Sequence, residues 1–212
     1  EKKLWLNEIH HRVKNSLQLS SSLISLKFDD FDNEEMKEVI LTLNFRLMAI
    51  SKLHDTLQVS KHSSELNMSL YINSIVSSFR SQFSIKMPVD INVSIPDDFF
   101  ISVKYGHCIG IIVAELLSNS VKHAFEKNNP QGAVIHICFE FPESNNDIPF
   151  LSFQDNGKGF DYDWSQQPDS FGLKLIYLFS KQLSASLSSN QCGGFNFKLS
   201  SPYFVKKSFA VT

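Results

Sequence analysis

Apolar residues in the first 60 positions recur at steps of three and four, the spacing that places side chains on one face of an α-helix. One helix is predicted from about residue 1 to residue 27, with an apolar face formed by Leu6, Ile9, Val13, Leu17 and Ile24. The acidic segment FDDFDNEE (28–35) interrupts this pattern, and its carboxylates suit the first turn of a new helix near Asn33. A second helix, to about Ser60, then carries an apolar face formed by Met36, Val39, Ile40, Leu43, Leu47, Ile50 and Leu57.

Two long helices joined by a short loop form an antiparallel hairpin. In such a hairpin each helix has only one other helix to pack against, so apolar surface is left over. Two hairpins from two chains bury that surface in a four-helix bundle. The sequence therefore predicts a homodimer that assembles through the hairpin, residues 1–62.

After the polar stretch 61–69, read as a joint, the pattern changes to helices mixed with short strands. Helices are predicted at 70–83, 104–126 and 172–183, and strands at 89–95, 133–141, 149–155, 185–189 and 194–200. This mixture indicates the α+β fold class, with helices on one face of a mostly antiparallel sheet. Residues 63–212 are expected to form this second domain.

The composition is that of a protein with an ordinary core: 42% of the 212 residues are hydrophobic and 20% are charged. A formal net charge of −2 provides no basic field, so nucleic-acid-binding proteins are excluded. The scattered cysteines, Cys108, Cys138 and Cys192, favour reduced thiols in a cytoplasmic protein. No membrane contact is expected, because no apolar run reaches the roughly 18 residues of a membrane span. Since the chain begins at Glu1 inside a helical pattern, we expect it to be the cytoplasmic part of a longer protein.

Two adjacent histidines stand in the stretch EIHHRVKN (8–15) of the first predicted helix. On an ideal helical wheel His10 lies at the edge of the buried face, roughly 55° from its centre, and His11 faces outward, roughly 150° away. Glu8 and Asn15 fall on the outward side with His11. A neutral imidazole nitrogen is a nucleophile near pH 7, and a carboxylate can fix its tautomer. The pattern fits a solvated helix surface as well as a reactive histidine.

Three stretches in the second half are compatible with one nucleotide site. The first is AELLSNSVKHAF (114–125), whose helical spacing groups Glu115, Asn119, Lys122 and His123 on one side. The amide oxygen of Asn119 is a hard ligand suited to Mg²⁺, and Lys122 offers a positive charge to phosphate. A polar helix face explains the same residues equally well.

The second stretch is QDNGKGF (154–160), where Asp155 can accept a hydrogen bond from the exocyclic amine of adenine. Gly157 and Gly159 allow the backbone to turn sharply and to approach a ligand closely. The third is SFGLKL (170–175), where Gly172 and the adjacent Leu173 open a helix whose free amide groups can hold phosphate. Each stretch alone is a weak signal, and the prediction rests on their order and spacing along the chain.

Together, these stretches resemble those of a known family, and the resemblance covers nearly the whole length of the chain. EIHHRVKNSLQ is similar to the dimerisation and phosphoacceptor segment of the second HisKA-type family of sensor histidine kinases, related to the HWE kinases, and RLMAISKLHDTL (46–57) is similar to the matching part of that hairpin. AELLSNSVKHAF, DNGKGF and FGLKLI resemble the N, G1 and G2 boxes of the GHKL ATP-binding fold. The resemblance implies a GHKL-type α/β sandwich for residues 63–212.

The resemblance also implies roles for single residues. His11 takes the place of the phosphoacceptor, Asn119 that of the Mg²⁺ ligand and Asp155 that of the adenine-reading aspartate. The glycines at 157, 159 and 172 take the places of the nucleotide-loop glycines, and residues 122 and 123 lie near the phosphates. The implied cofactors are ATP and Mg²⁺, and the implied partner is a response-regulator receiver domain.

The chain departs from the family pattern at three points. Asp169, Ser170 and Phe171 stand where the G2 box usually has a further glycine, and the lid between Phe160 and Phe171 is short, acidic and without Lys or Arg. The commoner kinases place a carboxylate directly after the acceptor histidine, whereas this chain has Arg12. We therefore expect Glu8 to orient the imidazole.

The expected function is a histidine kinase core that phosphorylates His11 from Mg-ATP and passes the phosphoryl group to a receiver aspartate. Asn15, one turn beyond His11, is expected to position water for dephosphorylation. One alternative is a phosphotransfer adaptor whose degenerate ATPase-like domain binds no ATP. Another is a GHKL ATPase or serine kinase that uses its helices only for contacts.

Overall fold

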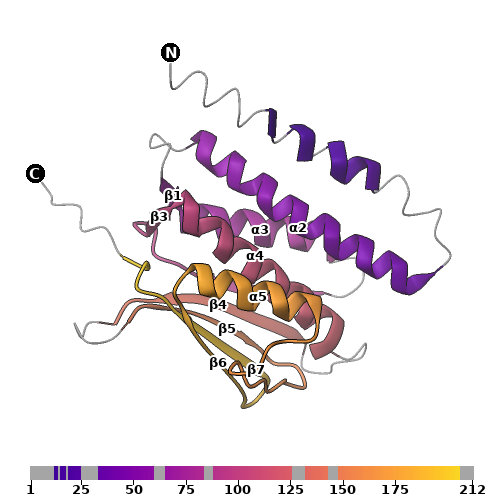
Figure 1. The fold of residues 1–212 in the computed structure, drawn as a ribbon. Helices are drawn as coiled ribbons and strands as arrows, with labels where there is room; N and C mark the ends of the chain where they lie inside the picture. Colours follow the sequence, from indigo (N-terminus) through magenta and orange to yellow (C-terminus); the bar gives the residue numbers. More distant parts are fainter. Residues whose placement is uncertain are drawn as a thin grey trace, which may run out of the picture.

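The computed structural model describes residues 12–13, 15–17, 19–24, 33–59, 65–83, 88–125, 132–142 and 148–205. Figure 1 shows three layers: the helical pieces near the N-terminus beside α2, then α3, α4 and α5, then the sheet. The α+β fold class is therefore confirmed, and within the described residues the helices cover one face of the sheet.

The second predicted helix is α2 (Glu34–Val59), and it begins where the acidic segment ends. The side chain of Asn33 accepts a hydrogen bond from the Met36 amide at 3.4 Å, which satisfies one of the free N–H groups of the first turn. The described residues between 12 and 24 are also helical, and Ser21 Oγ donates to Asn44 Oδ1 at 3.1 Å. This contact places the first helix beside α2, as the hairpin prediction requires.

The prediction that each hairpin helix has only one other helix to pack against is wrong for α2. A second apolar row on α2, formed at steps of four by Phe45, Ala49, Leu53 and Leu57, is buried in the same core as α3 and α4. The ring of Phe45 lies 5.2 Å from that of Phe79 on α3. The predicted row divides accordingly: Ile40 and Leu57 are buried, Leu47 and Ile50 are half-buried, and Met36, Val39 and Leu43 remain exposed.

The sheet has five strands in the order β2-β4-β5-β7-β6, with β2 and β4 parallel and every other pair antiparallel. Its strands match the predicted segments closely: β2 (Val89–Ser94), β4 (Ala133–Glu140), β5 (Phe150–Asp155), β6 (Ser186–Gln191) and β7 (Phe195–Ser200). Alternate residues of β4 face the helices, so Ala133, Ile135, Ile137 and Phe139 are buried. The mostly antiparallel sheet is thus confirmed.

The stretch 61–69, predicted as a polar joint, contains a short strand instead. β1 (Glu65–Asn67) pairs with β3 (Phe100–Ser102) in an antiparallel two-stranded sheet. Strands of three residues are too short to produce a clear alternation, and β1 itself holds a single apolar residue, Leu66, which is fully buried.

A tyrosine joins the three helices α2, α3 (Met68–Phe83) and α4 (Val103–Asn119). Tyr71 of α3 is fully buried and its hydroxyl donates to the carbonyl oxygen of Ala49 on α2 at 3.0 Å. The ring crosses α4 at Gly110, where a Cβ atom would lie only 2.1 Å from the tyrosine oxygen. Because glycine leaves this space, α2 packs firmly against the unit that contains the sheet.

α4 continues into a π-helical segment, η1 (Ser120–Ala124), before the chain becomes extended at Phe125. Such segments rotate side chains out of the α-helical register and are frequent at functional sites. α5 (Phe171–Gln182) follows the loop after β5 and packs beside α4. The end of α4 and the start of α5 therefore meet above the end of β5.

Candidate functional site

A cavity of about 400 Å³ lies where α4 and η1 meet the loop after β5, the start of α5 and the start of β7. Its lining combines apolar side chains with a few polar groups, as in small-molecule sites. The lining residues are Leu116, Asn119, Ser120, His123, Ala124, Asp155, Lys158, Gly159, Phe160, Ser170, Leu173 and Phe195.

Asp155, at the end of β5, is held by three hydrogen-bond donors. Its Oδ1 accepts from the backbone amides of Gly157 at 3.0 Å and Phe195 at 3.2 Å. Its Oδ2 accepts from the Ser120 hydroxyl at 2.6 Å. The carboxylate is 5% exposed, and since a carboxylate has about four acceptor positions, one position on Oδ2 remains for a ligand. A fixed acceptor of this kind suits an amine donor such as that of adenine.

The glycine-containing loop after β5 packs against the end of η1. A Cβ at Gly157 would lie 2.5 Å from the Ala124 carbonyl oxygen, and that same oxygen accepts from the Lys158 amide at 2.9 Å. Gly159 has a φ of +76°, in the left-handed region that favours glycine. The two glycines therefore serve close packing and a sharp turn, and only Gly159 lines the cavity itself.

The start of α5 forms the other end of the site. Ser170 caps this helix, accepting a hydrogen bond from the Leu173 amide at 3.3 Å. At Gly172 a Cβ atom would lie 2.9 Å from Glu115 Oε2 and 3.7 Å from Asn119 Oδ1. Two oxygen-bearing side chains of α4 thus lie against the first turn of α5, the end of a helix that attracts anions.

Two charged side chains at this end are paired with α2 of the hairpin. Arg46 donates from Nε and Nη2 to the two carboxylate oxygens of Glu115, the second bond being 2.8 Å long, and Glu115 is 1% exposed. The Arg46 guanidinium also lies 4.8 Å from the centre of the Phe171 ring. Lys122 Nζ lies 3.2 Å from Glu38 Oε1. This end of the site is therefore in contact with α2.

His123 has a pKa below the usual histidine value of 6.5. The main cause is partial desolvation of its ring, and the neighbouring Lys122 and Lys158 charges act in the same direction against a smaller opposing effect of Glu38. At neutral pH the imidazole beside the cavity is therefore uncharged.

The predicted nucleotide residues lie close together in space. Asn119, His123, Asp155, Gly159 and Leu173 line the cavity. Gly157 packs against Ala124 of the lining, and Gly172 lies against Asn119 of the lining and Glu115. Lys122 is not part of the lining and faces Glu38 on α2. Sequence reasoning missed Ser120, Phe160 and Phe195 in the lining and Arg46 beside it. Ser120 follows Asn119 directly, so its position in the motif could have indicated it, whereas Arg46 is 69 residues from Glu115 and gave no local signal.

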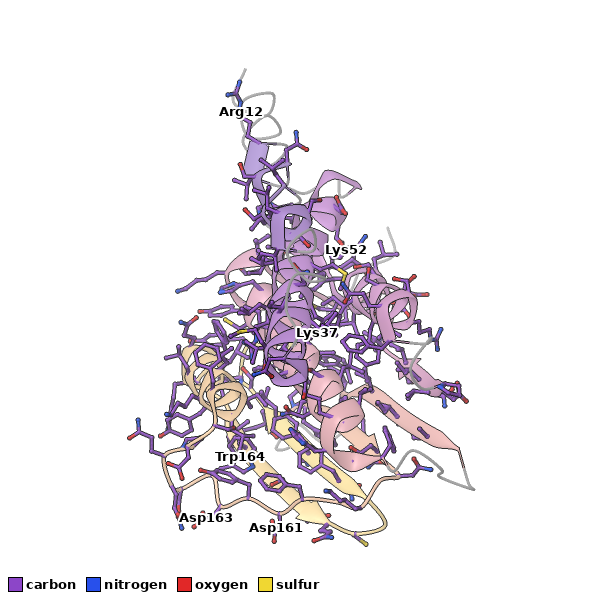
Figure 2. The ribbon with its side chains drawn as sticks, turned by 90° about the vertical axis from the view of Figure 1, so that its right-hand side faces the viewer. Arg12, Lys37, Lys52, Asp161, Asp163 and Trp164 are labelled. Carbon is purple, nitrogen blue, oxygen red and sulfur yellow. The ribbon has the colours of Figure 1, made fainter. Side chains whose placement is uncertain are left out.

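The proposed acceptor side is described only in part. His11 and Glu8 lie outside the described residues, and Asn15 is helical and exposed. Arg12 lies at the opposite end of the molecule from Asp161 and Asp163 in the loop before α5 (Figure 2). The described beginning of the first helix is therefore distant from that loop.

Residues 8–83 match the HisKA_2 family, described as histidine kinase. The protein named sensor histidine kinase PdtaS from Mycolicibacterium smegmatis is 28% identical over 184 residues, covering 86% of this chain, and its counterpart from Mycobacterium tuberculosis is 29% identical. This chain is related to the HisKA_2 histidine kinases. The aligned part is 36% of the length of these relatives, so the chain spans about a third of such a protein.

Solved structures show a similar fold. The histidine kinase domain of the Erythrobacter litoralis EL346 blue-light activated histidine kinase has a TM-score of 0.65 and 21% identity, over 93% of this chain and 90% of that one. The mycobacterial sensor histidine kinase MprB has a TM-score of 0.51 and 15% identity, over 65% of this chain and 95% of that one. The predicted resemblance to sensor histidine kinases is confirmed by these similarities.

Among the described residues, no helix is long and apolar enough to cross a lipid bilayer. Within the same residues, no group of three or more His, Cys, Asp and Glu side chains is arranged to hold a metal ion.

Proposed function

We propose that this chain is the kinase core of a sensor histidine kinase, which binds Mg-ATP and phosphorylates its own His11. The observation that carries the proposal is the fixed Asp155 carboxylate, held by three donors and open on one side toward a cavity of nucleotide size. This cavity lies beside a helical hairpin that matches the HisKA_2 family.

In this proposal the adenine amine donates to Asp155 and the phosphates extend toward the first turn of α5. The free amides of that turn and the charge of Lys122 neutralise the phosphate oxygens. Asn119 would hold Mg²⁺, because its amide oxygen lies at this end of the site and, with the phosphate oxygens, completes the hard oxygen donor set that Mg²⁺ prefers. Bound Mg²⁺ would offset the charge that develops on the phosphates.

Phosphoryl transfer then consists of an attack by a neutral His11 ring nitrogen on the γ-phosphorus. The nitrogen lone pair forms the N–P bond while the bond to the β,γ-bridging oxygen breaks and ADP leaves. Glu8 orients the imidazole and accepts the proton of its other ring nitrogen as the N–P bond forms. Arg12, the residue that follows His11 in the sequence, lies far from the loop before α5 (Figure 2). A displaced hairpin, or the hairpin of a second chain, brings the imidazole to the phosphate.

The exposed apolar residues of α2 support the proposed homodimer. Met36, Val39 and Leu43 are 45%, 49% and 41% exposed and lie at steps of three and four on one face of the helix. A second hairpin would cover them in a four-helix bundle. The partner that receives the phosphoryl group is the aspartate of a response-regulator receiver domain, in the cytoplasm where ATP is available. We further propose that Asn15 positions water for the reverse reaction.

The deciding experiment incubates wild-type protein and a His11→Ala variant with γ-labelled ATP. The wild type should acquire label that is lost in acid, because a phosphoramidate is acid-labile, and the variant should acquire none. Acid-stable label in both proteins would instead indicate a serine kinase. A wild type that binds no fluorescent nucleotide would favour the phosphotransfer adaptor.

Autophosphorylation of Glu8→Gln and Asn15→Ala tests the two supporting roles. Glu8→Gln should slow labelling, and an unchanged rate would remove Glu8 from the mechanism. Asn15→Ala should label at the wild-type rate and lose the ability to dephosphorylate a receiver domain.

A further inference from the structure

The terminal phosphate of a bound nucleotide needs a cation that the loop before α5 does not provide. Residues 161–170 contain three aspartates and neither Lys nor Arg. Lys158, the nearest preceding cation, belongs to the glycine loop beside Asp155, at the adenine end of the cavity. The positive charge at the phosphate end must therefore come from outside this loop.

The hairpin brings an arginine to that end. The guanidinium of Arg46, on α2, lies over Phe171, the first residue of α5, at 4.8 Å from the ring centre. It is paired with Glu115, whose Oε2 would lie 2.9 Å from a Cβ at Gly172. Arg46 is thus placed beside the first turn of α5, next to the amides proposed to bind phosphate, and its side chain is 17% exposed.

The ion pair with Glu115 uses only some of the hydrogen-bond donors of Arg46. A guanidinium carries five N–H groups in a fixed plane. Two of them, on Nε and Nη2, are used by the two oxygens of Glu115. No other acceptor among the described residues takes the remaining three, which can therefore donate to a ligand without breaking this ion pair, and the bidentate contact fixes the direction in which they point.

We propose that Arg46 is a phosphate-binding residue that contacts the terminal phosphate of ATP, with Glu115 as the residue that positions it. This inference rests on the proposed nucleotide site and adds to it a contact from the hairpin. ADP lacks the terminal phosphate, so the contact distinguishes ATP from ADP. It also makes the position of α2 depend on which nucleotide is bound.

The test measures dissociation constants for ATP and ADP, by displacement of a fluorescent nucleotide, for the full chain and three variants. Arg46→Ala should bind ATP roughly 10-fold more weakly and ADP within about twofold of the wild type, since one charge-assisted contact is lost. Arg46→Lys keeps the charge without the planar fork and should lose about threefold for ATP. The control is Arg80→Ala, because Arg80 donates to the Ile91 carbonyl oxygen on β2 and should leave the ATP:ADP ratio unchanged.

The possible outcomes separate this assignment from the proposed function. Wild-type protein that binds neither nucleotide overturns the proposed function. Wild-type protein that binds both, together with an Arg46→Ala variant whose ATP:ADP ratio is unchanged, overturns only the assignment of Arg46. An Arg46→Ala variant that loses ADP as well as ATP also contradicts the assignment, because Arg46 would then support the cavity as a whole.

Discussion

The two ends of the cavity are built differently. At the adenine end the donors that hold Asp155 come from η1, the glycine loop and β7, all within the unit that contains the sheet. At the phosphate end the charged groups Glu115 and Lys122 are paired with Arg46 and Glu38, both on α2. One end is complete without the hairpin, whereas the charge of the other depends on it.

In the proposed site, the end that recognises the purine is thus built separately from the end that holds the reacting phosphates. A purine can bind to acceptors that are already in place, so the adenine end should respond to mutation as a rigid site does. In the proposed site the phosphates would bind beside charged groups that form ion pairs with α2. Phosphate affinity should therefore change when residues of that helix are changed. The predictions that follow test this contrast, beginning with the largest effect.

Asp155→Asn should weaken ATP binding about 100-fold while the protein stays folded. The two backbone amides that reach Oδ1 require an oxygen there, so the new amide nitrogen replaces Oδ2 and presents a donor to the amine of adenine. The relative affinity for GTP should rise, because guanine carries an acceptor at that position. Titrations with both nucleotides measure this, and Asp161→Asn, an equal charge change on an exposed loop residue, should leave both affinities unchanged.

Ser120→Ala should weaken ATP binding about 10-fold, because Oδ2 of Asp155 loses the donor that orients it. Ser118→Ala is the matched control. Ser118 is a buried serine two residues away whose hydroxyl has no hydrogen-bond partner among the described residues, so its removal should have little effect. Equal losses in the two variants would show that the adenine end is not specifically organised by Ser120.

Glu38→Gln should tighten ATP binding about twofold, the small effect expected of a pair with an exposed carboxylate. The ion pair with Lys122 is lost, and the amine becomes free for phosphate. Calorimetric titration can resolve this change at low ionic strength, where such pairs are least screened. Asp55→Asn, which removes a charge farther along α2 near Lys52, is the control, and a comparable gain there would indicate a general effect of net charge.

The pH dependence of binding should be the smallest effect, about twofold. The pKa of His123 lies below 6.5 in the free protein, and the phosphates favour its charged form, so ATP affinity should rise as the pH falls below 6.5. Folding stability should change in the opposite direction, because the unfolded chain binds this proton more readily. Titrations and thermal melts at pH 7.5 and pH 6, with His123→Gln as the variant that removes both trends, test the assignment.

Most of the fold could be predicted from the sequence because its signals are local. The alternation in β2 and β4 and the helical periodicity of α2 each involve neighbouring residues, and the predicted bounds lie within a few residues of those observed. The same holds for the cavity lining, since Asn119, Asp155 and Gly159 belong to short motifs. β1 and β3 escaped prediction because three-residue strands have no periodicity to detect.

The role of α2 could not be predicted for a different reason. The sequence pattern predicts a single packing partner for each hairpin helix, yet Arg46 of α2 pairs with Glu115 on α4 and Phe45 packs against Phe79 on α3. Both contacts join positions far apart in the chain, and no spacing rule within one helix distinguishes a surface that faces solvent from one that faces another unit. The division at residues 62 and 63 stays a prediction, although α2 shares its core with the sheet-containing unit.

The sequence by itself determined which segments are helices and strands and which residue types are available for nucleotide chemistry, because both are encoded over a few neighbouring positions. Only the tertiary structure decided that three donors converge on Asp155 and that the charges at the phosphate end are shared with α2. These arrangements depend on how helices pack across distances of tens of residues, where burial and shape, rather than local pattern, select the contacts.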